Sequence, residues 1–125
     1  MLSGICFGTN DLERAIAFYD AVLPTIGFTR TVRGDVEAGY GKEGDVPVFW
    51  IVKPFNEEPA TYGNGTQVMF RVEDQALVDT FYHEALKHGG VDEGPPGPRS
   101  YSEGYYGAYC RDIDGNKIHV QFLPV

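Results

Sequence analysis

The chain has 125 residues, of which 42% are hydrophobic and 22% charged, so it suits one small globular domain and is not intrinsically disordered. Eighteen acidic residues against ten basic ones give a net charge of −8, and with no basic run we do not expect nucleic-acid binding. No apolar stretch approaches the roughly 20 residues of a membrane-spanning helix, and the N-terminus does not resemble a signal peptide. Two cysteines without CxxC spacing favour free thiols and a cytoplasmic location.

The sequence contains an internal repeat. When the chain is shifted by 63 residues against itself, six identities fall at equivalent places of a predicted strand and helix. The identical pairs are Phe7 and Phe70, Asp11 and Asp74, Phe18 and Phe81, Tyr19 and Tyr82, Leu23 and Leu86, and Gly27 and Gly90. We therefore expect two modules of one design, at about residues 1–53 and 65–125, joined by a linker at about residues 54–64.

The first module is predicted to begin with a strand at residues 2–9 and to continue with a helix. Asn10 is expected to cap this helix, and Glu13 stands where a capping box would place it. Apolar residues then recur every three or four positions, and Gly27 is expected to end the helix. Three short strands follow at residues 28–32, 36–40 and 46–52, separated by Gly-Asp turns.

The second module repeats this plan. Its predicted elements are a strand at residues 65–72, a helix at 74–88, a short strand near Val91, and strands at 105–111 and 117–122. Residues 93–104 contain three prolines and are expected to form neither strand nor helix. Two interpretations stay open for this stretch: an ordered flap over a cleft, or a long hairpin connection.

The fold class follows from the pattern of elements. One amphipathic helix covers only one face of a sheet, so each module leaves the other face for a partner or a ligand. The sequence therefore predicts a single α+β domain over residues 1–125, in which two βαβββ modules form a half-open, barrel-like sheet around a small-molecule cleft.

Three segments carry a resemblance to a known family: NDLERAIAFYDAVLPTIGF, TFYHEALKHGG and RDIDGNKIHVQF. In this order they resemble the glyoxalase/bleomycin resistance protein/dioxygenase superfamily, also called vicinal oxygen chelates, over essentially the whole chain. DIDGNKI is close to the family's Asp-Pro-Asp-Gly-Asn turn, with Ile113 in place of the proline. The resemblance implies paired βαβββ modules, homodimers and, in catalytic members, a divalent metal that acts as a Lewis acid on substrate oxygens.

The resemblance and strand alternation imply four positions for metal ligands, which are Gly4, approximately Phe49, Gln67 and His119. The first two cannot coordinate a metal, the glutamine amide is a weak donor, and the imidazole is a strong one. Catalytic zinc sites use three protein ligands, so we expect an incomplete set and no tightly bound divalent metal. The set is completed only if another residue, such as Glu103 or Asp45, reaches it.

His119 has two interpretations without a metal. We favour a hydrogen-bonded strand histidine in the cleft wall, and the alternative is a general acid–base, for which it is the candidate catalytic residue. His83 and His88 are expected to lie in solvent. Cys6 is expected to face the cleft, but no neighbouring base or helix N-terminus is evident to activate its thiol.

The remaining candidates would bind a ligand rather than react with it. Tyrosines around residues 93–104 can stack on flat ligands, and basic residues of the cleft-facing set suit an anionic or carbonyl-bearing one. Trp50 is either core or pocket wall, and charged residues at strand ends are as readily explained by solvent exposure. The full set of ligand-binding candidates is Gln67, Trp50, Phe49, Cys6, Arg71, Tyr101, Tyr106 and Lys117.

Two functions follow as hypotheses. The first is a small-molecule-binding protein of this superfamily with an incomplete metal site. The second is a glyoxalase-like lyase, isomerase or dioxygenase that uses His119 and Gln67 with an unusual metal or none. Because fold does not determine function, the ligand count favours the first. In both cases the expected partners are a small molecule and a second copy of the chain, with neither nucleic acid nor membrane involved.

Overall fold

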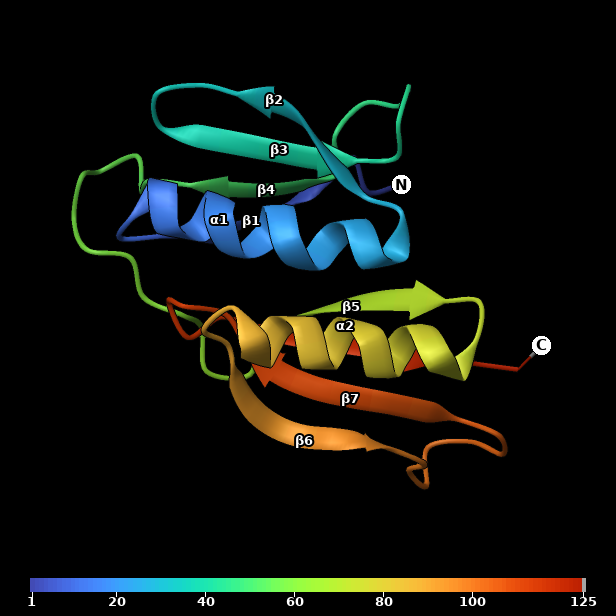
Figure 1. Ribbon diagram of the computed structural model, residues 1–125. Helices are drawn as coiled ribbons and strands as arrows, with labels where there is room; N and C mark the ends of the chain where they lie inside the picture. The colour runs from blue at the N-terminus through green and yellow to red at the C-terminus, as the bar shows by residue number, and fades with distance from the viewer. Residues whose placement is uncertain (125) are drawn as a thin grey trace.

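Each half of the chain folds as one main helix packed against a four-stranded sheet, and the two halves lie one above the other in Figure 1. The computed structural model describes residues 1–124. Module one contains β1 (Ile5–Gly8), α1 (Leu12–Val22), the 3₁₀ helix η1 (Leu23–Ile26), β2 (Thr29–Arg33), β3 (Glu37–Gly41) and β4 (Phe49–Val52). Module two contains β5 (Gln67–Val72), α2 (Gln75–Lys87), β6 (Val91–Gly97), β7 (Tyr106–Arg111) and β8 (Lys117–Phe122).

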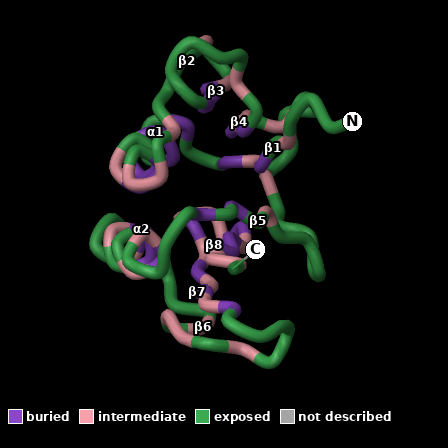
Figure 2. The backbone as a smooth tube through the Cα atoms, turned by 90° about the vertical axis from the view of Figure 1, so that its right-hand side faces the viewer, coloured by how far each residue is buried: buried purple, intermediate pink, exposed green. Residues whose placement is uncertain are grey.

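The two sheets have the same topology. Sheet A has the strand order β1-β4-β3-β2 and sheet B the order β5-β8-β7-β6, with one parallel pair followed by antiparallel pairs in each. Both helices lie on one side of the molecule, which leaves the other face of each sheet without a helix (Figure 2). No strand pairing joins the sheets within residues 1–124, so the barrel is not closed. The predicted α+β class and the pair of βαβββ units are confirmed.

Strand alternation separates a helix-facing side from an open side in each sheet. On β8, Ile118 and Val120 are at most 1% exposed and belong to the core beneath α2. Between them, His119 lies in register with Met69 of β5 and Tyr109 of β7, which places these three side chains on the open face of sheet B.

The cap of α1 is Asp11, not the predicted Asn10. Asp11 has an extended backbone, and its Oδ1 accepts a 3.1 Å hydrogen bond from the backbone N–H of Arg14. Asn10 instead bonds to Ala60 in both directions, which ties the chain after β4 to the start of α1. Glu13 forms an ion pair with Arg33 rather than completing a capping box. Asparagine and aspartate cap equally well, so local sequence could not choose between adjacent candidates.

The prediction that residues 93–104 form no strand is wrong for the first part of the stretch. Strand β6 runs to Gly97 and contains Pro95 and Pro96. In the described part of the chain it is an edge strand that pairs only with β7, with register shifts between Asp92 and Gly94 and between Gly94 and Gly97. Prolines are tolerated there because the outer side of an edge strand donates no ladder hydrogen bonds and bulges relieve the pairing.

Aromatic rings make the core continuous between the modules. The ring of Phe70 on β5 lies 5.6 Å from that of Phe49 on β4 and 5.9 Å from that of Phe28, centroid to centroid. Buried residues of both modules belong to one hydrophobic cluster. The modules are thus held together first by apolar burial, which is the largest favourable term in folding.

Hydrogen bonds close one end of the junction between the modules. The turn at residues 112–116, which has the sequence DIDGN, contacts the start of α1, and we call this contact the latch. Asp112, Asn116 and Thr9 of the latch are at most 4% exposed, so each of their polar groups needs a partner. Its bonds are Tyr19 Oη to Asp112 Oδ2 (2.5 Å), Thr9 Oγ1 to Asp114 Oδ2 (2.6 Å), Asn10 N to Asp114 Oδ1 (2.9 Å) and Asn116 Nδ2 to the Gly8 carbonyl (3.0 Å).

Candidate functional site

The other end of the junction is a cleft of about 640 Å³. Shifting Thr9 and Asn10 of the latch by the 63-residue repeat gives Val72 and Glu73, and both line this cleft. Residues 42–48 join β3 to β4 as residues 112–116 join β7 to β8, so they are the counterpart of the latch turn. The cleft therefore lies where an equivalent of the latch would form.

The sequence explains why no second latch forms. Val72 stands where Thr9 supplies a hydroxyl donor, so the bond that Thr9 makes to Asp114 has no equivalent. Glu73 stands where Asn10 donates its backbone N–H, and it keeps that N–H. Of residues 42–48, Lys42 and Val48 line the cleft, and neither has a carboxylate that could accept hydrogen bonds as Asp114 does. Among residues 1–124, no backbone hydrogen bond joins residues 42–48 to module two.

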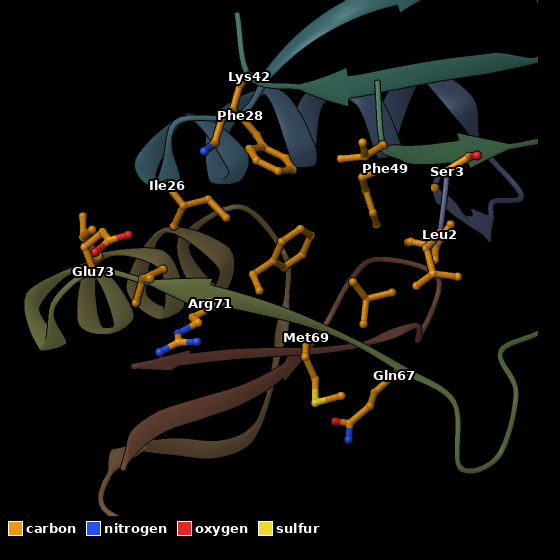
Figure 3. Close-up of a pocket in the computed structure, with 17 residues that line it drawn as sticks. Leu2, Ser3, Ile26, Phe28, Lys42, Phe49, Gln67, Met69, Arg71 and Glu73 are labelled. Carbon is orange, nitrogen blue, oxygen red and sulfur yellow. The ribbon is translucent and has the colours of Figure 1, made fainter. Parts of the chain in front are cut away.

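Both modules contribute walls to the cleft, and these walls are mostly apolar. Figure 3 shows Ile26, Phe28 and Phe49 of module one on one side of β5. Phe70 completes the aromatic wall, where its ring meets those of Phe28 and Phe49 edge-on. Such a wall suits a flat, apolar ligand body, because aromatic rings combine large contact area with low conformational freedom.

Polar side chains lie at the rim of the cleft. Lys42 comes from the loop before β4, and Gln67, Arg71 and Glu73 come from β5 and its end. In Figure 3, Gln67 and Arg71 leave β5 on the side away from Phe28. Arg71 donates a 3.2 Å hydrogen bond to the carbonyl of Leu123. The structure thus brings three predicted binding residues, Phe49, Gln67 and Arg71, to one cleft.

A second hollow of about 800 Å³ lies beneath residues 52–59 and is less suited to a specific ligand. Its walls include Phe55, whose side chain is fully exposed, and the acidic residues Glu37, Glu57 and Glu58. Phe55 and the two later glutamates belong to the irregular segment after β4, which lacks helix and strand. We therefore regard the cleft between the modules as the main candidate site.

The predicted candidate His119 lies elsewhere, on the open face of sheet B, and is only 3% exposed. Its Nε2 is 2.5 Å from the hydroxyl of Tyr105, and its ring stacks on Tyr109 at 4.2 Å between centroids. Its Nδ1 is buried and has no hydrogen-bond partner within residues 1–124. Whichever tautomer is present, one ring nitrogen remains unpaired, at a cost of about 1–3 kcal/mol.

The environment of His119 keeps its ring neutral at pH 7. Burial, followed by the positive charges of Lys117 and Arg99, lowers the pKa of His119 to about 4. Burial and hydrogen bonding raise the pKa of Tyr109 above its ordinary value, and burial raises that of Tyr105. An imidazole with so low a pKa is a weak base at neutral pH, which argues against general acid–base work.

Two basic side chains flank this aromatic cluster. The ammonium of Lys117 lies 4.9 Å from the ring centre of Tyr109, and the guanidinium of Arg99 lies 6.0 Å from it. Both distances are within the range of cation–π attraction. Tyr101, which was also predicted as a binding residue, donates to or accepts from the hydroxyl of Tyr109 at 2.8 Å.

On the open face of sheet A, Cys6 lies in register with Trp50, and Trp50 packs over Gly39. A Cβ atom on Gly39 would lie 2.9 Å from the indole ring, so glycine makes room for it. Burial, and then the charge of Glu37, raise the pKa of the Cys6 thiol. The thiol therefore stays protonated near neutral pH. Cys6 is exposed and is not among the residues that line the cleft.

Phe49 and Tyr106 face the helices. Phe49 is 1% exposed and packs on Phe7 and Tyr19, although its edge reaches the cleft. The hydroxyl of Tyr106 donates a 2.8 Å hydrogen bond to Asp79 of α2, away from the open face. Tyr106 therefore joins neither the cleft nor the cluster around His119.

The residues at the four positions implied for a divalent metal do not fit one. A Cβ atom on Gly4 would lie 2.8 Å from the carbonyl oxygen of Val48, so no side chain fits there without a backbone shift. Phe49 belongs to the core, Gln67 is exposed, and Nε2 of His119 is bonded to Tyr105. No group of three or more His, Cys, Asp or Glu side chains able to hold a metal occurs within residues 1–124.

Comparisons with known proteins agree with this fold. A profile of the Glyoxalase/Bleomycin resistance protein/Dioxygenase superfamily matches residues 2–120, and the chain belongs to this superfamily. A glyoxalase/bleomycin resistance protein from Albidiferax ferrireducens T118 is 38% identical, with a TM-score of 0.88 and 99% of both chains covered. Comparison with curated proteins gives no significant match.

More distant structures share the fold alone. A glyoxalase-related enzyme from Fulvimarina pelagi is 21% identical, with a TM-score of 0.79 over 100% of this chain and 89% of that one. The fosfomycin resistance protein FosX from Mesorhizobium loti is 22% identical, with a TM-score of 0.70 over 100% and 93% of the two chains. None of the helices among residues 1–124 is long and apolar enough to cross a membrane.

Proposed function

We propose that this protein binds a small, mostly apolar organic molecule in the cleft between its modules. The observation that carries the proposal is the asymmetry of the junction, in which one end is closed by the latch and the other leaves about 640 Å³. That volume is within the range of small-molecule sites, and the combination of an aromatic wall with a few rim charges is typical of them. The rim cations Lys42 and Arg71 favour a ligand with an anionic or carbonyl group.

The enzymatic alternative has less support in the site. It needs His119 as an acid or base, but this ring is buried, bonded to Tyr105, and has its pKa lowered to about 4. A metal-dependent form of this alternative would also need a third ligand, and the position of Gly4 has no room for one. Binding requires no such group, because contact with apolar walls supplies most of the free energy.

The test is a titration with 8-anilinonaphthalene-1-sulfonate, a flat aromatic anion whose fluorescence rises in apolar surroundings. Val48 lines the cleft and is 39% exposed, so Val48→Trp should narrow the cleft while the chain still folds. We expect at least a tenfold loss of dye affinity in this variant. Val91→Trp on β6, 59% exposed and outside the cleft, is the matched control and should bind like the unmodified chain. Equal affinities in both variants would place the dye elsewhere.

The homodimer implied by the superfamily belongs to this proposal. Its support is the open side of the sheets, where Met69 is 58% exposed and Trp50 is half-buried. Light scattering after gel filtration should give twice the 13.8 kDa of one chain, and a mass of 13.8 kDa at micromolar concentration would contradict it. The cytoplasmic location stays a prediction.

A further inference from the structure

Residues 98–105, which we call the strap, connect β6 to β7 and carry a phenol into the interior. Tyr105 at the end of the strap is 2% exposed, although residues 100–104 are all exposed. Its ring turns back across Gly107, where a Cβ atom would lie 2.1 Å from the Tyr105 hydroxyl oxygen. Glycine at this position of β7 therefore creates the space that the phenol occupies.

The surroundings of this phenol have the composition of a binding site. The hydroxyl of Tyr105 meets Nε2 of His119 at 2.5 Å, and the ring of Tyr101 meets that of Tyr105 edge-on at 5.0 Å. Nδ1 of His119 is buried and unpaired. A phenol in the place of Tyr105 would pair with Nε2 as Tyr105 does, so the observation that points to a phenol is the pair between the Tyr105 hydroxyl and Nε2.

Side chains rather than backbone hold the strap in place. Among residues 1–124, its only backbone hydrogen bond outside the strand ladders runs within it, from Tyr105 N to the carbonyl of Ser102 at 3.3 Å. Its hydroxyl contacts to the sheet are those of Tyr105 to His119 and of Tyr101 to Tyr109. A segment anchored in this way opens at a lower free energy than one built into a ladder.

From these contacts we propose that Tyr105 is an internal substitute for a ligand, and that the space beside His119 takes a phenol in its place when the strap opens. The ligand is a hydroxylated aromatic ring whose hydroxyl pairs with His119. Lys117 and Arg99, near Tyr109, favour an anionic substituent on it. This site lies on the open face of sheet B, and neither Tyr105 nor His119 lines the cleft between the modules.

The first experiment tests whether the space that the Tyr105 ring occupies can bind a phenol. Tyr105→Gly removes the internal phenol, and p-cresol should then bind and raise the melting temperature. Toluene, which has the same ring and methyl group but no hydroxyl, should bind at least tenfold more weakly because it leaves His119 unpaired. Tyr105→Gly combined with His119→Phe should bind both compounds alike. Equal binding of p-cresol and toluene to Tyr105→Gly would overturn the pairing with His119.

The second experiment uses the unmodified chain and asks whether the strap opens. Arg99 lies in the strap, so trypsin cleavage after it reports opening, while cleavage after Arg14 on α1 is the internal control. We expect p-cresol at millimolar concentration to accelerate cleavage at Arg99 several-fold and to leave Arg14 unchanged. If p-cresol leaves the Arg99 rate unchanged up to its solubility limit, Tyr105 is a fixed part of the core and the proposal is wrong.

Tyr105→Phe keeps the test decisive if Tyr105→Gly does not fold. It retains the ring but not the hydroxyl, so the strap should open more readily and p-cresol should act at a lower concentration. A Tyr105→Phe chain no easier to cleave at Arg99 than the unmodified chain would count against the anchoring role of the hydroxyl. Val48→Trp should leave the p-cresol effect unaltered, which separates this proposal from that of the cleft.

Discussion

The hydroxyl of Tyr19 donates a 2.5 Å hydrogen bond to the carboxylate of Asp112, which lies 93 residues later in the chain and in the other module. The same carboxylate accepts hydrogen bonds from the backbone N–H groups of Asp114 and Asn116 and from the Asn116 side chain. Burial nevertheless raises the pKa of Asp112, because these bonds only partly offset the loss of water. The two modules are thus joined through the buried carboxylate of Asp112, and each of its hydrogen bonds helps to offset the cost of burying it.

Tyr19→Phe should therefore destabilise the protein by about 2 kcal/mol, since a buried charged acceptor loses a donor while the aromatic packing is kept. Urea unfolding followed by circular dichroism measures this change. Tyr40→Phe is the control: Tyr40 donates to Asp20, but Asp20 is exposed and regains water, so the cost should be about 1 kcal/mol or less. A smaller loss for Tyr19→Phe than for Tyr40→Phe would contradict the importance of the latch.

His119 should make the protein acid-sensitive. Its pKa is lowered from 6.5 to about 4 on folding, so the unfolded chain binds the proton more tightly between these values. Stability should be unaffected by this group above pH 6.5 and should fall as the pH decreases towards 4, by about 3 kcal/mol in all. Unfolding free energies measured between pH 7 and pH 4 for the unmodified chain and His119→Gln should show the smaller slope in the variant. His83→Gln, on the exposed face of α2, should keep the full slope.

Lys42 should select for the anionic group of a ligand in the cleft. Lys42→Met removes one exposed charge, and an exposed ion pair contributes about 0.2–1 kcal/mol. Affinity for 8-anilinonaphthalene-1-sulfonate should fall up to about fivefold, while affinity for the uncharged N-phenyl-1-naphthylamine should stay the same. Lys87→Met, in the last turn of α2 and away from the cleft, should change neither affinity. Equal losses for both dyes on Lys42→Met would indicate that the lysine acts through packing.

Gly4 should tolerate no larger residue. Gly4→Ala places a methyl group 2.8 Å from the Val48 carbonyl oxygen, so one of the two segments must shift. We expect a loss of about 1–3 kcal/mol in thermal or urea unfolding. Gly34→Ala is the matched control because its new methyl group would meet nothing closer than 3.5 Å, and it should be neutral or slightly stabilising. Unchanged stability in Gly4→Ala would mean that this strand start has room for a side chain.

Much of the fold could be predicted because its signals are local. The periodicity of α1 and α2 and the 63-residue repeat give the two modules without long-range information. Errors fell where local signals were ambiguous. Residues 46–48 were predicted to begin a strand because of Val46 and Val48, yet β4 starts at Phe49. Pro47 lies between the two valines and cannot donate to a ladder.

The cleft could not be predicted because its walls meet only after the modules pair. Phe28 and Phe70 had the pattern of ordinary strand residues, and their contact depends on the angle between two sheets. Tyr106 was predicted as a binding residue and Tyr105 and Tyr109 were not, for a related reason. Whether Tyr106 or Tyr109 of β7 lies beside His119 depends on strand register, because a shift of one residue moves every side chain to the other face. Tyr105 reaches His119 because its ring turns back across Gly107, which strand alternation does not predict. The repeat could have indicated the cleft, since Val72 and Glu73 replace the polar residues Thr9 and Asn10.

The one-sided latch also has a mechanical consequence. The junction is hydrogen-bonded at one end and held by aromatic contacts at the other. A change in the angle between the modules should therefore be easiest at the cleft, where it would separate Phe28 from Phe70 and keep the bond between Tyr19 and Asp112. The width of the cleft between the modules is therefore the part of this fold that should change most easily. Two related chains could accept ligands of different thickness through substitutions in the latch alone, with every residue that touches the ligand unchanged.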